Sequence, residues 1–304
     1  MNDRPKNLAK SVRDRLMNHA RSRGEEFQFV LTRFALERLL YRITQSAHRQ
    51  VFVLKGAMLF SLWTKETHRP TKDLDLLGFG EPAISRFQDI FREVCVVDVE
   101  ADGLVFHPDS VQAAKIKEDQ DYEGIRVTFF ATLERARIPL QIDIGFGDTI
   151  TPGAVSVDYP TILEFPAPAL RAYPRETVVA EKYQAMVMLG IANSRMKDFY
   201  DLWVMAKTMD FDGQSLSSAI RATFEHRKTA IPAETTLALT ATFTEDAGKQ
   251  TQWRAFVRKS KLQGAGVELP DVAILLQSFL MPPSQSMTQG SGFTDRWQNG
   301  GPWK

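Results

Sequence analysis

Two aspartates, Asp73 and Asp75, stand one residue apart in the apolar run DLDLLGF. Strands disfavour aspartate, yet the leucines of this run are typical of a strand that packs into a core. Side chains alternate between the faces of a strand, so both carboxylates point to one face, with Cα atoms roughly 7 Å apart. At that separation they could bind one or two cations, whereas burying them unpaired costs free energy. The pattern predicts either a metal site or a strand with one solvated polar face.

A third aspartate, Asp143, repeats this arrangement in LQIDIGFGD, where Ile142 and Ile144 flank it. Three carboxylates on neighbouring strands of one small sheet would form an all-oxygen site suited to Mg²⁺. Asp148 could join the site instead, but it follows two glycines and is interpreted as a turn residue. The five histidines show no ligand spacing, which disfavours zinc.

The segment FVLKGAMLFSLW predicts a strand, a turn at Lys55-Gly56-Ala57 and the start of a helix. A glycine at such a junction allows backbone N–H groups to approach a phosphate at the helix N-terminus. The number of residues between Gly56 and Asp73 allows one helix that leads to the adjacent strand.

A third group of residues lies in the helical pattern of the C-terminal half. Lys182 stands among apolar residues, and Asp198 and Asp201 share one helix face at i,i+3. Lys197 and Asp201, at i,i+4, could pair. One interpretation is a surface ion pair on an amphipathic helix. The other is that Lys182 binds a triphosphate, while Asp198 or Asp201 orients a lysine, a base or an attacking hydroxyl.

Composition excludes several classes of protein. The chain has 304 residues, 43% hydrophobic and 25% charged, with a formal net charge of +1. Residues 1–50 nevertheless hold eleven Lys/Arg against five acids, either a solvated helical face or a surface that meets a polyanion. The single cysteine excludes a disulfide framework, and no apolar stretch reaches transmembrane length. The polar N-terminus is not a signal peptide, so we expect a soluble, cytoplasmic protein.

The elements that must position these residues follow from periodicity. Helices are expected in the first fifty residues and from Pro166 onward. Five β-rich runs lie between them: VFVL, DLDLLGF, VCVVDVEADGLVF, IRVTFFATL and IPLQIDIGFGD. The expected fold class is α+β, a small mixed sheet with N-terminal helices and a helical C-terminal half. The expected domains are residues 1–165 and 166–281, followed by a disordered tail at 282–304, which is rich in Pro, Gly, Ser and Gln.

Taken together, these motifs resemble the AbiEii/AbiGii nucleotidyltransferase-like toxin family, a branch of the polymerase-beta-type nucleotidyltransferase superfamily. The resemblance rests on LKGAMLFSLW…RPTKDLDL (54–76), IDIGFGD (142–148) and AEK…NSRMKDFYDL (180–202). It covers most of residues 25–260 in order and spacing.

The resemblance implies that residues 1–165 form a nucleotidyltransferase-like domain in which Asp73 and Asp75 hold catalytic Mg²⁺. It implies that Asp143 is a third metal ligand or the general base on the acceptor hydroxyl. It also makes Asp198 or Asp201 the final acid of the motif, with Asp198 favoured.

The same resemblance implies a triphosphate site. Lys55 and Gly56 belong to the turn near the triphosphate, and Lys182 is the phosphate-binding lysine. Lys197 is a further candidate for nucleotide binding. Ala57 stands where the superfamily usually has serine, so a hydroxyl contact to the phosphate is lost while the backbone amides remain.

The implied function is that of a toxin in a toxin–antitoxin, abortive-infection system of antiviral defence. Such an enzyme transfers NMP from an NTP to RNA, with the tRNA 3′ end as the expected acceptor, and its cognate antitoxin acts as a transcriptional repressor. The basic N-terminal helices and WRAFVRKSKL (253–262) are the candidate RNA surface. The alternatives are a protein or RNA kinase on the same fold, a non-catalytic nucleotide-binding module, and an α/β protein with incidental acids. The motifs select neither the NTP nor the acceptor.

Overall fold

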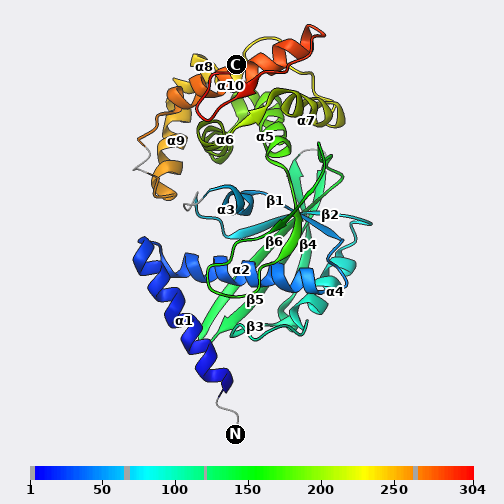
Figure 1. Cartoon of the computed structure of the whole chain (residues 1–304), viewed down its shortest axis with the longest axis vertical. Helices are drawn as coiled ribbons and strands as arrows, with labels where there is room; N and C mark the ends of the chain where they lie inside the picture. Colours follow the sequence, from blue (N-terminus) through cyan, green and yellow to red (C-terminus); the bar gives the residue numbers. More distant parts are fainter. Residues whose placement is uncertain (1–3, 65–68, 120–121, 263–265) are drawn as a thin grey trace. The chain divides into compact units, whose positions relative to one another are not determined.

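The computed structural model describes residues 4–64, 69–119, 122–262 and 266–304. It divides into two compact units, the first made of residues 1–148 and 155–173 and the second of 149–154 and 174–304 (Figure 1). Among the described residues, no helix combines the length and apolar character needed to span a membrane.

The first unit contains a mixed eight-stranded sheet in the order β3-β5-β6-β2-β1-β8-β7, with β4 also paired to β5. The β2–β6 and β1–β8 pairs are parallel and the others are antiparallel. The strands are β1 (Phe52–Lys55), β2 (Asp73–Gly78), β3 (Leu104–Phe106), β4 (Gln112–Asp119), β5 (Tyr122–Leu133), β6 (Ala136–Phe146), β7 (Val155–Asp158) and β8 (Ala169–Ala172). The expected α+β class with a mixed sheet is confirmed.

Helices cover one face of this sheet. Phe91 of α4 packs against Phe52 of β1 and Phe129 of β5, with ring centroids 5.8 and 6.0 Å apart. In Figure 1, α2 runs across the strands. In the central strand β6, the alternate residues Ile138, Leu140, Ile142 and Ile144 are apolar and buried, as half-buried strands require. The helical segments of the unit are α1 (Arg4–Arg23), α2 (Phe27–Gln45), η1 (Ala57–Leu59), α3 (Phe60–Trp63), α4 (Ile84–Cys95) and η2 (Pro108–Ser110).

The prediction of a β-rich run at residues 94–106 is wrong for most of its length. Cys95 is the last residue of α4, and only Leu104–Phe106 forms a strand. Phe91, Val94 and Cys95 belong to the buried face of an amphipathic helix, whose packing overrides local β propensity. Burial raises the pKa of the Cys95 thiol to about 12, so the thiol stays protonated at neutral pH.

A group of charged side chains is buried where α2 meets the loop before β3. Arg42 forms a bidentate pair with Asp102 at 2.6 and 3.1 Å, and Arg38 Nε donates to the same carboxylate at 3.1 Å. Nearby on α2, Glu37 is 1% exposed and accepts a hydrogen bond from the backbone N–H of Ile162. Burial raises the pKa of Glu37 to about 8, because that hydrogen bond and the charge of Arg38 offset the lost hydration only in part.

Glu37 therefore makes the stability of the fold fall as the pH rises from 4.5 to about 8. Its pKa exceeds the ordinary value of 4.5, so its protonated form stabilises the fold below pH 4.5, and this contribution is lost as the pH rises through about 8. The full difference corresponds to about 5 kcal/mol. We expect Glu37→Gln to remove most of the fall in unfolding free energy between pH 6 and pH 9, measured by urea denaturation. The exposed Glu100→Gln should follow the wild type, and equal pH slopes for all three proteins would contradict this assignment.

The second unit is mainly helical, as expected for the C-terminal half. Its segments are α5 (Arg175–Leu189), η3 (Gly190–Ala192), α6 (Met196–Thr208), β9 (Phe211–Asp212), α7 (Gly213–His226), η4 (Leu237–Leu239), α8 (Ala241–Thr244), α9 (Ala247–Lys259), α10 (Leu269–Thr288) and β10 (Arg296–Trp297). Strands β9 and β10 form a separate antiparallel pair.

The expectation of a disordered tail at residues 282–304 is not met. Helix α10 continues through Pro282 and Pro283 to Thr288, and β10 follows. Trp297 is 1% exposed and donates its indole N–H to the Ala206 carbonyl at 2.6 Å, while Trp303 donates to the Phe279 carbonyl at 3.0 Å. The polar composition of this segment predicted disorder, but its tryptophans anchor it to the unit.

Candidate active site on the sheet

Strand β2 carries Asp73 and Asp75 on the face opposite to its buried leucines. Leu74 and Leu76 are 0% and 1% exposed, whereas both aspartates remain partly accessible. Thr71 Oγ1 donates to Asp73 Oδ1 at 2.5 Å and so restrains the first carboxylate. The alternation predicted from the sequence therefore holds, and the two carboxylates share one face of the sheet.

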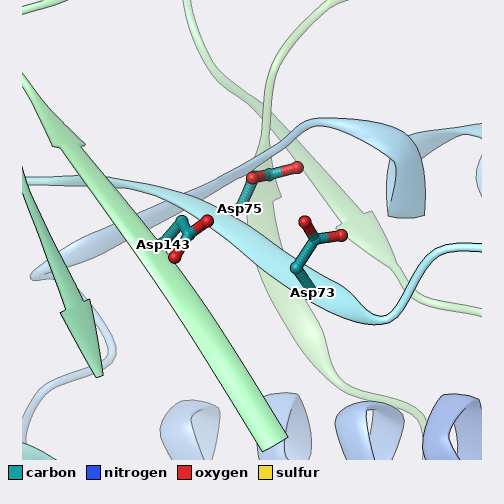
Figure 2. Close-up of side chains that lie close together, drawn as sticks. All are labelled: Asp73, Asp75 and Asp143. Atoms are coloured by element: carbon teal, nitrogen blue, oxygen red, sulfur yellow. The ribbon is translucent and has the colours of Figure 1, made fainter. Parts of the chain in front are cut away.

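Asp143 lies beside Asp75, because β2 and β6 are parallel neighbours in a register that pairs these two residues. One carboxylate oxygen from each of Asp73, Asp75 and Asp143 lies within 4.8 Å of the others, and Figure 2 shows the three side chains gathered over the two strands. These are hard oxygen donors at a spacing that fits a divalent cation such as Mg²⁺. The sheet thus brings together the three acids that the sequence singled out.

Gly56 leaves the space that the Asp75 carboxylate occupies. A Cβ atom at position 56 would lie 1.9 Å from Asp75 Oδ2, and the backbone φ of +74° also disfavours other residues. Gly56 therefore admits the side chain of a neighbouring strand, and its approach to a phosphate stays a prediction. The short η1 and α3 follow it, so the helix expected there is short among the described residues.

Replacing Gly56 with Ala should therefore displace Asp75. We expect an affinity for Mn²⁺, used as a spectroscopic probe of the carboxylates, at least tenfold weaker than that of the wild type. Gly24→Ala is the matched control, because Gly24 also has a positive φ (+65°) but no atom within 4 Å of the added Cβ. It should lose roughly 1 kcal/mol of stability from the backbone alone and keep its Mn²⁺ affinity. Equal Mn²⁺ affinities for the two variants would show that Gly56 does not make room for Asp75.

Cationic side chains flank the carboxylates in the same register. Lys55 on β1 lies opposite Asp75 in the β1–β2 register. Its Nζ lies 3.1 Å from Asp148 Oδ2. The Asp148 side chain is 5% exposed and also accepts a hydrogen bond from Tyr173. Asp148 is therefore more than the turn residue that the sequence indicated, since it holds Lys55.

Arg126 flanks the other side of the cluster, and sequence reasoning missed it. It pairs with Asp143 in the β5–β6 register, and its Nε and Nη2 donate to the two oxygens of Asp143, each at 2.7 Å. This hydrogen bonding raises the pKa of the Arg126 guanidinium. A charged residue in the apolar run IRVTFF was the available signal. The row across four strands reads Arg126, Asp143, Asp75, Lys55.

A second cluster lies within the helical unit. Lys182 of α5 is close to two aspartates of α6, with Nζ 2.5 Å from Asp198 Oδ1 and 2.9 Å from Asp201 Oδ2. The two aspartate side chains are 4% and 0% exposed, and Arg195 Nε lies 3.0 Å from Asp198 Oδ2. Burial alone would raise the pKa of Asp198, but the positive charges of Lys182 and Arg195 outweigh it and hold that pKa below its ordinary value.

The predicted pairing of Lys197 with Asp201 is wrong. Lys197 is exposed and makes no ion pair within the described part of the chain, whereas Asp201 points into the unit toward Lys182. The interpretation as a surface ion pair is corrected in the same way, because the pairing partner comes from α5 and the contact is buried.

Comparison with known proteins identifies the family to which the sequence is similar. The model of the nucleotidyl transferase AbiEii toxin family, from type IV toxin–antitoxin systems, matches residues 38–277. The crystal structure of JHP933 from Helicobacter pylori is 14% identical, covers 84% of this chain and 92% of its own, and has a TM-score of 0.47. The structure of a candidate nucleotidyltransferase from H. pylori is 15% identical, with coverages of 85% and 96% and a TM-score of 0.48. No curated protein matches the sequence.

Proposed function

The chain belongs to the AbiEii nucleotidyltransferase family of type IV toxins, and we propose that it transfers NMP from an NTP to an RNA acceptor, the 3′ end of a tRNA. The observation that carries the proposal is the row of carboxylates on adjacent strands, flanked by Lys55 and Arg126. Such a row combines hard oxygen ligands for a cation with positive groups suited to phosphates.

The carboxylate spacing fits Mg²⁺, and Asp73 and Asp75 would hold it. When bound, this ion would neutralise charge on the triphosphate. Groups of the protein itself would bind the phosphates. Lys55, oriented by Asp148, and the backbone amides at Gly56 and Ala57 would bind phosphate oxygens.

In the second unit, Lys182 is proposed as a further phosphate-binding lysine, and Asp198 as the acid that orients it. The 2.5 Å contact between Lys182 Nζ and Asp198 Oδ1 supports this assignment. Asp201 contacts the same ammonium group and shares its charge.

The proposed reaction forms a bond between an acceptor hydroxyl oxygen and the α-phosphorus of the NTP. The bond from that phosphorus to the bridging oxygen breaks, pyrophosphate leaves, and the hydroxyl proton passes to solvent. Asp143 accepts hydrogen bonds from Arg126 on both oxygens. Asp143 is therefore not assigned as the base.

The test is label transfer. Purified protein is incubated with Mg²⁺, total tRNA and each α-³²P-NTP in turn, beside an Asp73→Ala control. Label on tRNA that is absent with the variant supports the proposal and identifies the nucleotide. Transfer of γ-³²P instead would establish a kinase, and binding of nucleotide without any transfer would establish a binding module.

Exposed basic residues mark where RNA would bind. In α1, Lys10, Arg15, Arg21 and Arg23 are exposed, and further exposed arginines and lysines lie on α9. Phosphate contacts of this kind make RNA affinity fall steeply with salt. The toxin–antitoxin family implies a cognate antitoxin, which we propose is a transcriptional repressor.

A further inference from the structure

Asp143 is the most constrained of the three clustered carboxylates. Both of its oxygens accept from Arg126 at 2.7 Å, and Oδ2 also accepts from the Gln141 side-chain amide at 3.2 Å. The residue is 8% exposed. To act as a third metal ligand, Asp143 would have to give up these hydrogen bonds in order to bind the ion. They are charge-assisted, and such hydrogen bonds are stronger than those between neutral groups.

Arg126 is placed differently from Asp143. Its side chain is 41% exposed, and Asp143 engages its Nε and Nη2. Within the described part of the chain, Nη1 makes no hydrogen bond. A planar guanidinium fixed on one edge and accessible on the other is suited to bind phosphate oxygens.

Charge balance gives the same result. Asp73, Asp75 and Asp143 carry three negative charges within 4.8 Å, a repulsion that Arg126 reduces by one unit. The pair Asp143–Arg126 is then neutral, so Asp143 adds no net negative charge for a divalent cation.

We infer that Arg126 binds the polyphosphate of the nucleotide and that Asp143 positions Arg126 rather than ligating the metal. This inference rests on the proposed function, because it assigns roles within the same site. Arg126 touches substrate, and Asp143 acts through it together with Gln141.

The decisive variant is Asp143→Asn/Arg126→Gln, which removes both members of the pair and leaves the net charge of the site unchanged. With Mn²⁺ as the probe, we expect the affinity of this double variant to stay within about threefold of the wild type. Asp75→Asn should weaken Mn²⁺ binding at least tenfold. If the double variant loses Mn²⁺ affinity as Asp75→Asn does, Asp143 is a metal ligand and the inference is overturned.

The second measurement uses inorganic tripolyphosphate, the group common to every NTP, bound to Mn²⁺-loaded protein. Hydrogen bonds to charged groups predict a loss of about ten- to a hundredfold in affinity for Arg126→Gln. Arg126→Lys keeps the charge without the planar fork and should recover only part of that loss. Unchanged tripolyphosphate affinity in Arg126→Gln would overturn the role of Arg126.

These measurements are separate from the proposed transfer reaction, because neither needs an acceptor. If no label reaches RNA but Arg126→Gln loses tripolyphosphate affinity, the proposed function fails and the inference stands. If label is transferred and the affinity is unchanged, the inference alone fails.

Discussion

Asp75→Asn should lower the rate of nucleotidyl transfer by about a thousandfold while the protein stays folded. Asp75 lies between Asp143 on one strand and Lys55 on the other, over the space left by Gly56. Asparagine keeps the size of the side chain but removes the negative charge that would hold a cation. A cation held at such a site would stabilise the charge of the transition state by several kcal/mol. Losing this stabilisation corresponds to roughly this factor in rate.

The measurement is the initial rate of α-³²P transfer, with thermal unfolding of each variant as the test of folding. Asp158→Asn is the matched control, because Asp158 is an exposed aspartate of β7 in the same sheet. It should retain the wild-type rate. An Asp75→Asn variant that keeps more than a tenth of the wild-type rate would exclude Asp75 from the catalytic centre.

The part of the site that could be predicted from the sequence is the part that follows from alternation along one strand. Asp73 and Asp75 had to share a face, and the apolar neighbours of Asp143 showed that it too lies in a strand. The helical periodicity around Lys182 and Asp198 located α5 and α6 in the same way. Each of these inferences needs only local geometry.

The pairing between strands could not be read from the sequence. Register places Arg126 beside Asp143 and Lys55 beside Asp75, and register depends on the whole sheet. For the same reason, the ion pair between Asp148 and Lys55, which are distant in sequence, could not be predicted. The polar composition of the tail indicated disorder. Composition alone does not reveal that the Trp297 side chain is buried.

Lys182→Met should both destabilise the protein and abolish transfer. The substitution leaves Asp198 and Asp201 buried without the ammonium group that they share, although Asp198 keeps its contact with Arg195. Removing one partner of a buried ion pair costs about 3–5 kcal/mol. The pKa of Asp198 lies below its ordinary value, so the stability it contributes is present at neutral pH and is lost only as the pH falls through that lowered pKa. The unfolding free energy measured by urea denaturation at pH 7 therefore includes the full contribution of Asp198.

Lys182→Met/Asp201→Asn separates the structural role of Lys182 from its catalytic role. The second substitution removes one of the two buried aspartate charges that contact Lys182 Nζ, while Asp198 keeps its contact with Arg195. We expect the double variant to regain most of the lost stability and to remain inactive in the label-transfer assay at a temperature where all variants are folded. If Lys182 only neutralises buried aspartates, the double variant would recover activity together with stability. A stable but inactive double variant, beside an active Asp201→Asn single variant, would instead assign Lys182 to the substrate, because neither stability nor Asp201 would explain the loss.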